Sequence, residues 1–150
     1  MKTNKLILIA FTIAAVFLST SCKKKIRGCT DPAATNYKTS ANEEDGSCTF
    51  EGSVVLWYGQ TTSDLLIQNG HSFLEYSIDY SYADDSDCSA YYTTAPNCGE
   101  SGSVTVTKNL GNSSSKSFYY SVVCVGTDSV LWSGNLTFTA KTCTKHELHY

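Results

Sequence analysis

Residues 117–140 read SFYYSVVCVGTDSVLWSGNLTFTA, and this stretch decides the fold class. Apolar and polar residues alternate over short runs on both sides of residues 126–129 (GTDS), which is the pattern of two β-strands and a turn. We therefore expect an antiparallel hairpin. Alternate residues of the second strand share one face, and we expect this face to be buried because it carries Trp132 and Phe138. Its members are Val130, Trp132, Gly134, Leu136 and Phe138.

Shorter runs of the same kind occur at residues 52–58, 72–82, 101–107 and 144–148, separated by Gly, Asn, Ser and Asp. No stretch has the periodicity of a long helix. Six or seven strands in about 100 residues predict an all-β fold, a small antiparallel β-sandwich. Residues 109–115 (NLGNSSS) are expected to form a longer flexible loop.

The N-terminal residues have the pattern of an export signal. Two lysines precede a mostly apolar run at residues 6–18, and this run of 13 residues is too short to span a bilayer, which takes about 20. Residues 19–22 (STSC) resemble the lipobox of bacterial lipoproteins, although Ser19 stands where that family has leucine. The resemblance implies a signal peptide at residues 1–21 and lipidation of Cys22. Its acyl chains would anchor the protein in a membrane, and we expect an outer-membrane lipoprotein that faces the periplasm.

Charge divides the rest of the chain into two parts. Residues 22–28 carry four basic side chains beside Cys22, a composition suited to a tether that lies against anionic headgroups. The remaining chain has five basic residues against 14 acidic ones, a net charge of −9. An acidic body of this kind excludes nucleic acid as a partner.

Seven cysteines are present, and lipidation of Cys22 would leave an even number for disulfides in an oxidising compartment. Cys29 and Cys48 bracket a short polar segment and are expected to pair. The other four allow three pairings, of which we favour Cys98 with Cys143 and Cys88 with Cys124.

Residues 29–49 form a separate segment that is too polar to build a core, so a disulfide has to hold it. Residues 28–48 (GCTDPAATNYKTSANEEDGSC) resemble a cysteine-bounded module of exported bacterial proteins, GCxDPxAxNYxxxAxxxDGSC. The resemblance indicates kinship and names no activity. Oxygen atoms on this constrained loop are candidate calcium ligands, and they belong to Asp31, Asn42, Glu44 and Asp45. The alternative is a plain disulfide-tied spacer.

Residues 50–150 are expected to form the β-sandwich domain. Their C-terminal part has a CGxSGSVT-like strand, an aromatic-rich strand, a WxGxxxxTxxxC strand and a final strand that ends in leucine. This pattern resembles transthyretin-like or carboxypeptidase-regulatory-like sandwiches of exported bacterial proteins, which implies the sandwich fold and brings no catalytic residues. The matching residues are Cys98, Gly99, Gly102, Val104, Thr105, Trp132, Gly134, Thr139, Cys143 and Leu148.

The chain has no GxSxG elbow or other catalytic constellation, so we expect a non-enzymatic binding or structural module. Tyrosine is abundant, and the candidate contacts for a glycan or an envelope protein are Tyr91, Tyr92, Tyr119 and Tyr120. The alternative is that these rings belong to the core and the sheet surface. Residues 84–87 (DDSD) are expected in a loop, where their carboxylates could hold calcium or a basic partner.

Two further functions stay open at this point. A small hydrolase acting on envelope glycans would need two carboxylates about 5 to 9.5 Å apart across an aromatic-lined groove. A calcium-dependent adhesive module would use the ligands proposed for residues 29–49.

Overall fold

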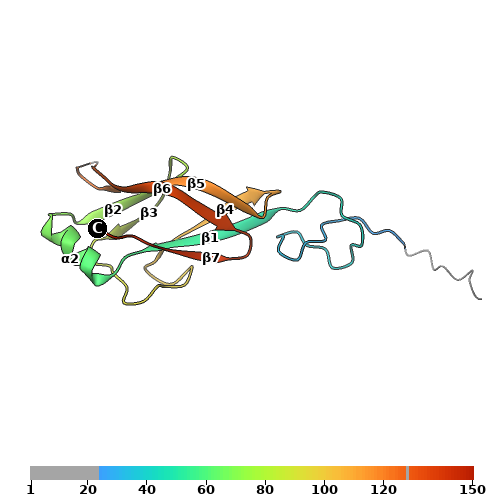
Figure 1. Cartoon of the computed structure of the whole chain (residues 1–150), viewed down its shortest axis with the longest axis horizontal. Helices are drawn as coiled ribbons and strands as arrows, with labels where there is room; N and C mark the ends of the chain where they lie inside the picture. The colour runs from blue at the N-terminus through green and yellow to red at the C-terminus, as the bar shows by residue number, and fades with distance from the viewer. Residues whose placement is uncertain (1–23, 128) are drawn as a thin grey trace, which may run out of the picture.

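The computed structural model describes residues 24–127 and 129–150, so the predicted signal peptide and Cys22 lie outside the described residues. Two sheets pack face to face (Figure 1). One has the strand order β4-β1-β7 and the other β3-β2-β5-β6. The strands are β1 (Phe50–Trp57), β2 (Phe73–Ile78), β3 (Ser81–Asp87), β4 (Val104–Gly111), β5 (Ser115–Cys124), β6 (Ser129–Thr139) and β7 (Cys143–Glu147). The predicted all-β sandwich is confirmed, and its strands pair antiparallel except β7, which runs parallel to β1.

β5 and β6 form the predicted hairpin. Phe138 is buried as expected, but Val130 is 58% exposed. The cause is a bulge, because Val122 pairs with Trp132 whereas Val123 pairs with Val130. One extra residue in β6 therefore moves Val130 to the opposite face, and the expected common face is correct only from Trp132 onward.

Residues 72–82, expected as one strand, contain all of β2, a tight turn and the start of β3. The turn consists of Asp79 and Tyr80, with φ angles of 56° and 61°. Positive φ at both central residues defines a type I′ hairpin turn, which fits the right-handed twist of the flanking strands. Residues 84–87, expected in a loop, lie in β3.

The prediction of a flexible loop at residues 109–115 is wrong. Pairing with β1 extends β4 beyond the end that the local sequence suggests. Asn109 lies opposite Glu51 in this ladder. Only residues 112–114 are left to connect the two sheets.

The hydrophobic core lies between the sheets. Val54 and Leu56 of β1 face Val122 and Phe138 of the other sheet, and all four side chains are at most 2% exposed. Full burial of such a side chain stabilises the fold by roughly 1.5–3 kcal/mol. Gly52 is needed where β1 passes the end of β6, because a Cβ there would lie 2.6 Å from the Thr139 carbonyl oxygen.

A short helix, α2 (Gln60–Gln68), closes the end of the sandwich near the C-terminus (Figure 1). The sequence pattern did not predict it. Leu66 is fully buried, and two hydroxyl groups of the helix donate hydrogen bonds to the body: Thr62 to the Leu148 carbonyl and Ser63 to the Cys88 carbonyl. Tertiary contacts rather than local propensity hold this helix.

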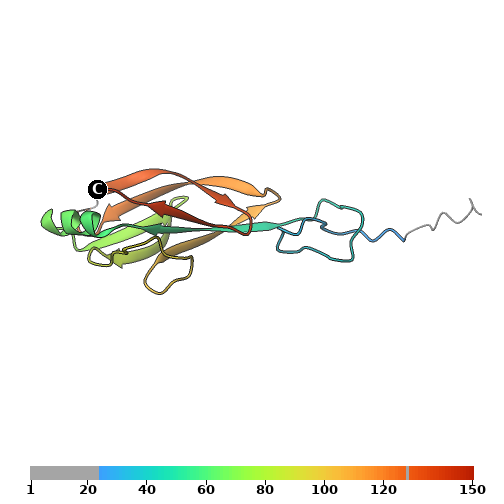
Figure 2. The same cartoon turned by 60° about the horizontal axis from the view of Figure 1, so that its bottom comes forward.

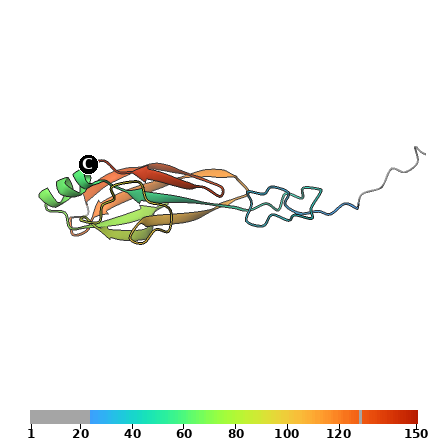
Figure 3. The same ribbon diagram turned by 90° about the horizontal axis from the view of Figure 1, so that it is seen from below.

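Residues 24–49, which we call the stalk, extend from the end of the sandwich opposite α2, as Figures 2 and 3 show. The predicted disulfide between Cys29 and Cys48 closes the stalk. At the junction with the sandwich, the Lys141 ammonium donates to the Pro32 carbonyl. The molecule is thus an elongated β body on a narrow stalk.

Candidate binding face

The four tyrosines predicted to contact a ligand are distributed over different parts of the body. Tyr119 and Tyr120 are neighbours in β5, so their rings point to opposite sides of the sheet. Tyr120 is 7% exposed, and its hydroxyl lies 3.2 Å from Nε2 of His146. Tyr92 is half-buried and donates from its hydroxyl to the Ser101 carbonyl, while Tyr91 is exposed in the same loop. Of the four, only Tyr119 lies on the outer face of a sheet.

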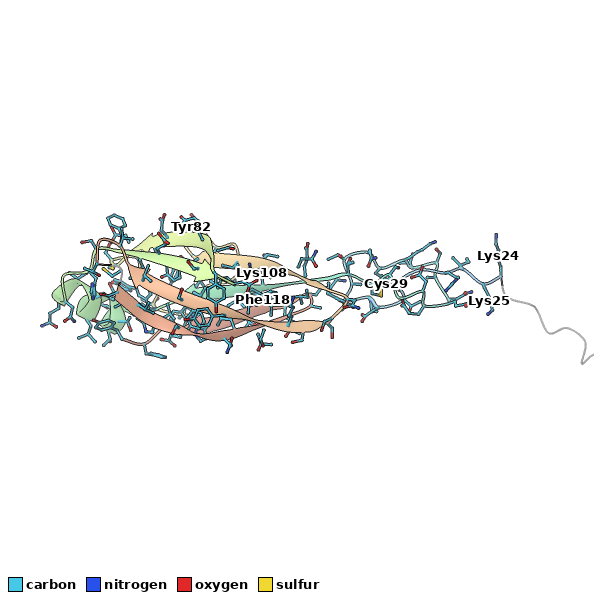
Figure 4. The ribbon with its side chains drawn as sticks, turned by 90° about the horizontal axis from the view of Figure 1, so that it is seen from above. Lys24, Lys25, Cys29, Tyr82, Lys108 and Phe118 are labelled. Carbon is cyan, nitrogen blue, oxygen red and sulfur yellow. A yellow bond between two sulfur atoms is a disulfide. The ribbon has the colours of Figure 1, made fainter. Side chains whose placement is uncertain are left out.

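A different set of aromatic side chains gathers on the outer face of the sheet β3-β2-β5-β6. Tyr80 stacks on Tyr119 with ring centroids 5.3 Å apart and an angle of 20° between the ring planes. Tyr82 lies on β3, where it is opposite Ser77, and is 61% exposed (Figure 4). Tyr80, Tyr82 and Tyr119, together with the carboxylates of Glu75 and Asp85 described next, form what we call the tyrosine face.

The carboxylates of the tyrosine face come from adjacent strands. Glu75 of β2 lies directly opposite Asp85 of β3. The Tyr82 hydroxyl donates to Oδ2 of Asp85 at 2.8 Å, and this hydrogen bond raises the pKa of Tyr82, as do the negative charges of Asp84 and Glu75 nearby. Carboxylates and phenol rings therefore share one small area of the sheet.

Tyr80 combines high exposure with a strained backbone. It is 84% exposed, the most of any large hydrophobic side chain in the described residues. The left-handed conformation costs a residue with a Cβ roughly 1–2 kcal/mol, and type I′ turns prefer Asn-Gly where this chain has Asp79 and Tyr80. Sequence reasoning missed Tyr80 as a site residue because an Asp-Tyr pair gives no signal for this turn.

The proposed calcium ligands of the stalk are engaged in hydrogen bonds with the stalk's own backbone. Glu44 accepts bonds from the amides of Thr30 and Gly46, which lower its pKa together with a bond from the Thr30 hydroxyl. The other three side chains accept in the same way: Asp31 from the Ala33 amide, Asn42 from the Ile26 amide and Asp45 from the Ser47 amide.

Glu44 lies beside the stalk disulfide. Among the described residues, one group of three metal-ligating side chains lies close together, and it consists of Glu44, Cys29 and Cys48. The two sulfur atoms of this group are bonded to each other. The acidic side chains of the stalk therefore act as internal caps.

The cysteines of the body form one of the two expected disulfides. Cys98 is bonded to Cys143, as predicted. The pairing of Cys88 with Cys124 is wrong, since both are free thiols. Cys88 lies beside Ser72 on one side of β2 and Cys124 beside Leu74 on the other. Two strand spacings of roughly 4.8 Å separate them, which exceeds the Cα separation of a disulfide.

Both free thiols are buried. Burial raises the pKa of the Cys88 thiol to about 11. Cys124 is 2% exposed and lies 3.0 Å from Nδ1 of His71. A buried thiol of high pKa holds little thiolate at neutral pH, so Cys88 acts as a small apolar side chain of the core.

A hollow of about 360 Å³ lies where the stalk meets the body. Hydroxyl groups of Thr35, Ser53, Thr107 and Thr142 line it together with Lys141. Glu51 is the one carboxylate residue in its lining, whereas glycoside hydrolysis takes a pair.

Comparison with protein-family models, with curated proteins and with solved structures gave no match. Within residues 24–127 and 129–150, no helix has the length and apolar character to cross a membrane. The two disulfides indicate an extracytoplasmic protein.

Proposed function

We propose that this protein is a lipid-anchored, non-enzymatic binding module of the cell envelope, held by Cys22 in the outer membrane and facing the periplasm. The leader pattern, the basic residues after Cys22 and the disulfides support this location. The stalk would hold the β body away from the membrane surface (Figure 2). The tyrosine face is then the surface presented to a ligand.

One observation carries the binding role, namely that Tyr80 has a strained backbone and an exposed ring stacked on Tyr119. A turn selected for stability alone would have glycine at this position. Strained residues persist where the surrounding structure holds them and the strain serves a function. Exposed tyrosines offer a large contact area at a low cost in side-chain entropy, which suits recognition of a glycan or a protein.

The binding role is tested by sedimentation of the purified chain with isolated envelope fragments. We expect Tyr80→Gly to raise the apparent dissociation constant about tenfold, which corresponds to a contact worth roughly 1.4 kcal/mol. Tyr37→Ser is the matched control, because Tyr37 is an exposed tyrosine of the stalk. Equal sedimentation of Tyr80→Gly and the unaltered chain would contradict the proposal.

The anchor is tested separately by intact-mass spectrometry of the protein isolated from membranes. An acylated N-terminal Cys22 and loss of membrane association in Cys22→Ser are expected. A mass without acyl chains would refute the anchor and leave the binding test unaffected.

A further inference from the structure

The distribution of charge along the chain is uneven. Residues 39–107 contain no lysine or arginine. Within this stretch, the β2–β3 hairpin at residues 73–87 carries the carboxylates of Glu75, Asp79, Asp84, Asp85 and Asp87. The hairpin that bears the tyrosine face therefore carries only negative charge.

The fold does not neutralise this charge. The ion pairs in the described part of the chain are Lys25 with Glu43 and His149 with Glu147, and neither involves the hairpin. Lys108 and Lys116 lie over the ring of Phe118, 5.5 and 4.9 Å from its centroid, and the Lys108 ammonium donates to the Ile78 carbonyl of the hairpin rather than to a carboxylate. Figure 4 shows Lys24 and Lys25 at the far end of the stalk.

The carboxylates of the tyrosine face also repel each other. Glu75 and Asp85 are directly opposite across the β2–β3 ladder, and like charges in this position destabilise a sheet. The same hairpin holds Tyr80 in its left-handed conformation. The repulsion and the strained turn thus coincide on one exposed surface, and the repulsion is the feature that a ligand rather than the fold would compensate.

We propose that the tyrosine face binds a lysine- or arginine-rich segment of a partner protein. The inference rests on the proposed binding role and adds the chemistry of the partner. A cationic side chain placed between Glu75 and Asp85 would remove their repulsion, and another could lie over the exposed ring of Tyr80. A neutral glycan could stack on the tyrosines but would leave the carboxylates uncompensated, so the charges favour a basic protein segment.

The test measures binding of fluorescent decalysine and decaarginine peptides to the purified full-length chain in detergent by fluorescence anisotropy. The double variant Glu75→Gln, Asp85→Asn removes two charges from the tyrosine face. The control Glu51→Gln, Asp64→Asn removes two charges from exposed positions on β1 and α2. We expect the first variant to weaken peptide binding at least about tenfold and the control to change it less than about twofold.

Tyr80→Gly should weaken binding of the same peptides although it leaves the net charge unchanged. This variant therefore measures the contribution of the ring apart from that of the carboxylates. Binding of the peptides by the unaltered chain should fall as the salt concentration rises. Equal weakening in the two double variants would overturn the proposal, because it would show attraction to net charge alone.

A second titration distinguishes this inference from the proposed function. If a neutral oligosaccharide such as chitohexaose binds, loses affinity in Tyr80→Gly, and the peptides do not bind, the basic partner is refuted and the binding role stands. If Tyr80→Gly leaves envelope binding unchanged as well, the proposed function fails together with the inference.

Discussion

At the scale of single residues, the stalk is held by side chains that accept hydrogen bonds from its backbone N–H groups, which strand pairing would satisfy in a sheet. Glu44 is the central one, because its two oxygens accept hydrogen bonds from both ends of the segment, at Thr30 and at Gly46. These bonds favour the ionised form and lower the pKa of Glu44. The pKa of Asp45 is lowered in the same way by hydrogen bonds from Ser47. The local stability of the stalk is therefore linked to pH.

The sign of this linkage predicts acid sensitivity. Because the pKa of Glu44 is lower in the folded stalk than its ordinary value of 4.5, its contribution is fully present above that value. It is lost as the pH falls through the lowered pKa. We expect amide protection factors of Thr30 and Gly46, measured by NMR hydrogen exchange, to drop between neutral pH and pH of about 3.

Glu44→Gln should lower these protection factors at neutral pH and weaken their dependence on pH. Glu43→Gln is the control, since the Glu43 side chain pairs with the exposed Lys25 and accepts none of the hydrogen bonds from Thr30 and Gly46. Protection that is independent of pH in the unaltered chain would show that Glu44 does not secure the stalk.

At the scale of elements, the β2–β3 hairpin combines opposing contributions. The left-handed conformation of Tyr80 costs roughly 1–2 kcal/mol, while its stack on Tyr119 returns about 0.5–1.5 kcal/mol. Strain and stacking nearly cancel in the folded protein. The exposed ring is therefore maintained at little net cost to stability.

A double-mutant cycle separates these contributions. Tyr80→Gly alone should change the free energy of unfolding by less than about 1 kcal/mol, because strain relief opposes the lost stack and the higher chain entropy of glycine. In a Tyr119→Ser background, where no stack is left to lose, the same substitution should stabilise by about 0.5–1 kcal/mol. Urea denaturation measures both values. A loss above about 1 kcal/mol in both backgrounds would contradict the strain assigned to Tyr80.

At the scale of the whole molecule, the two disulfides cross-link different parts of the chain. Cys29–Cys48 closes a loop inside the stalk with a sequence separation of 19 residues. Cys98–Cys143 ties the loop before β4 to the start of β7, with a separation of 45 residues. Both tryptophans, Trp57 and Trp132, belong to the body, so their fluorescence reports its unfolding.

We expect replacement of Cys98 and Cys143 by serine to lower the free energy of unfolding by about 4 kcal/mol on the chain-entropy model. Replacement of Cys29 and Cys48 should leave the tryptophan-monitored transition unchanged, because the loop that this disulfide closes lies within the stalk. Denaturation followed by tryptophan fluorescence measures both. A large shift on removing the stalk disulfide would show that the two parts unfold together.

Local alternation of side chains was sufficient to predict the strands around residues 117–140, the hairpin between them and the two-layer fold. The pairing of Cys29 with Cys48 followed from their closeness along the chain. These features depend on neighbours in sequence, whose geometry the residue pattern describes directly.

Only the tertiary structure decided the remaining features. The strand order places Cys88 and Cys124 on either side of β2, where both stay free thiols. α2 exists because buried partners hold Leu66 and Ser63. Tyr80 joins Tyr119 through a turn without the usual glycine signal. Residues far apart in sequence make each of these contacts, and local propensity carries no information about which distant partners will be near.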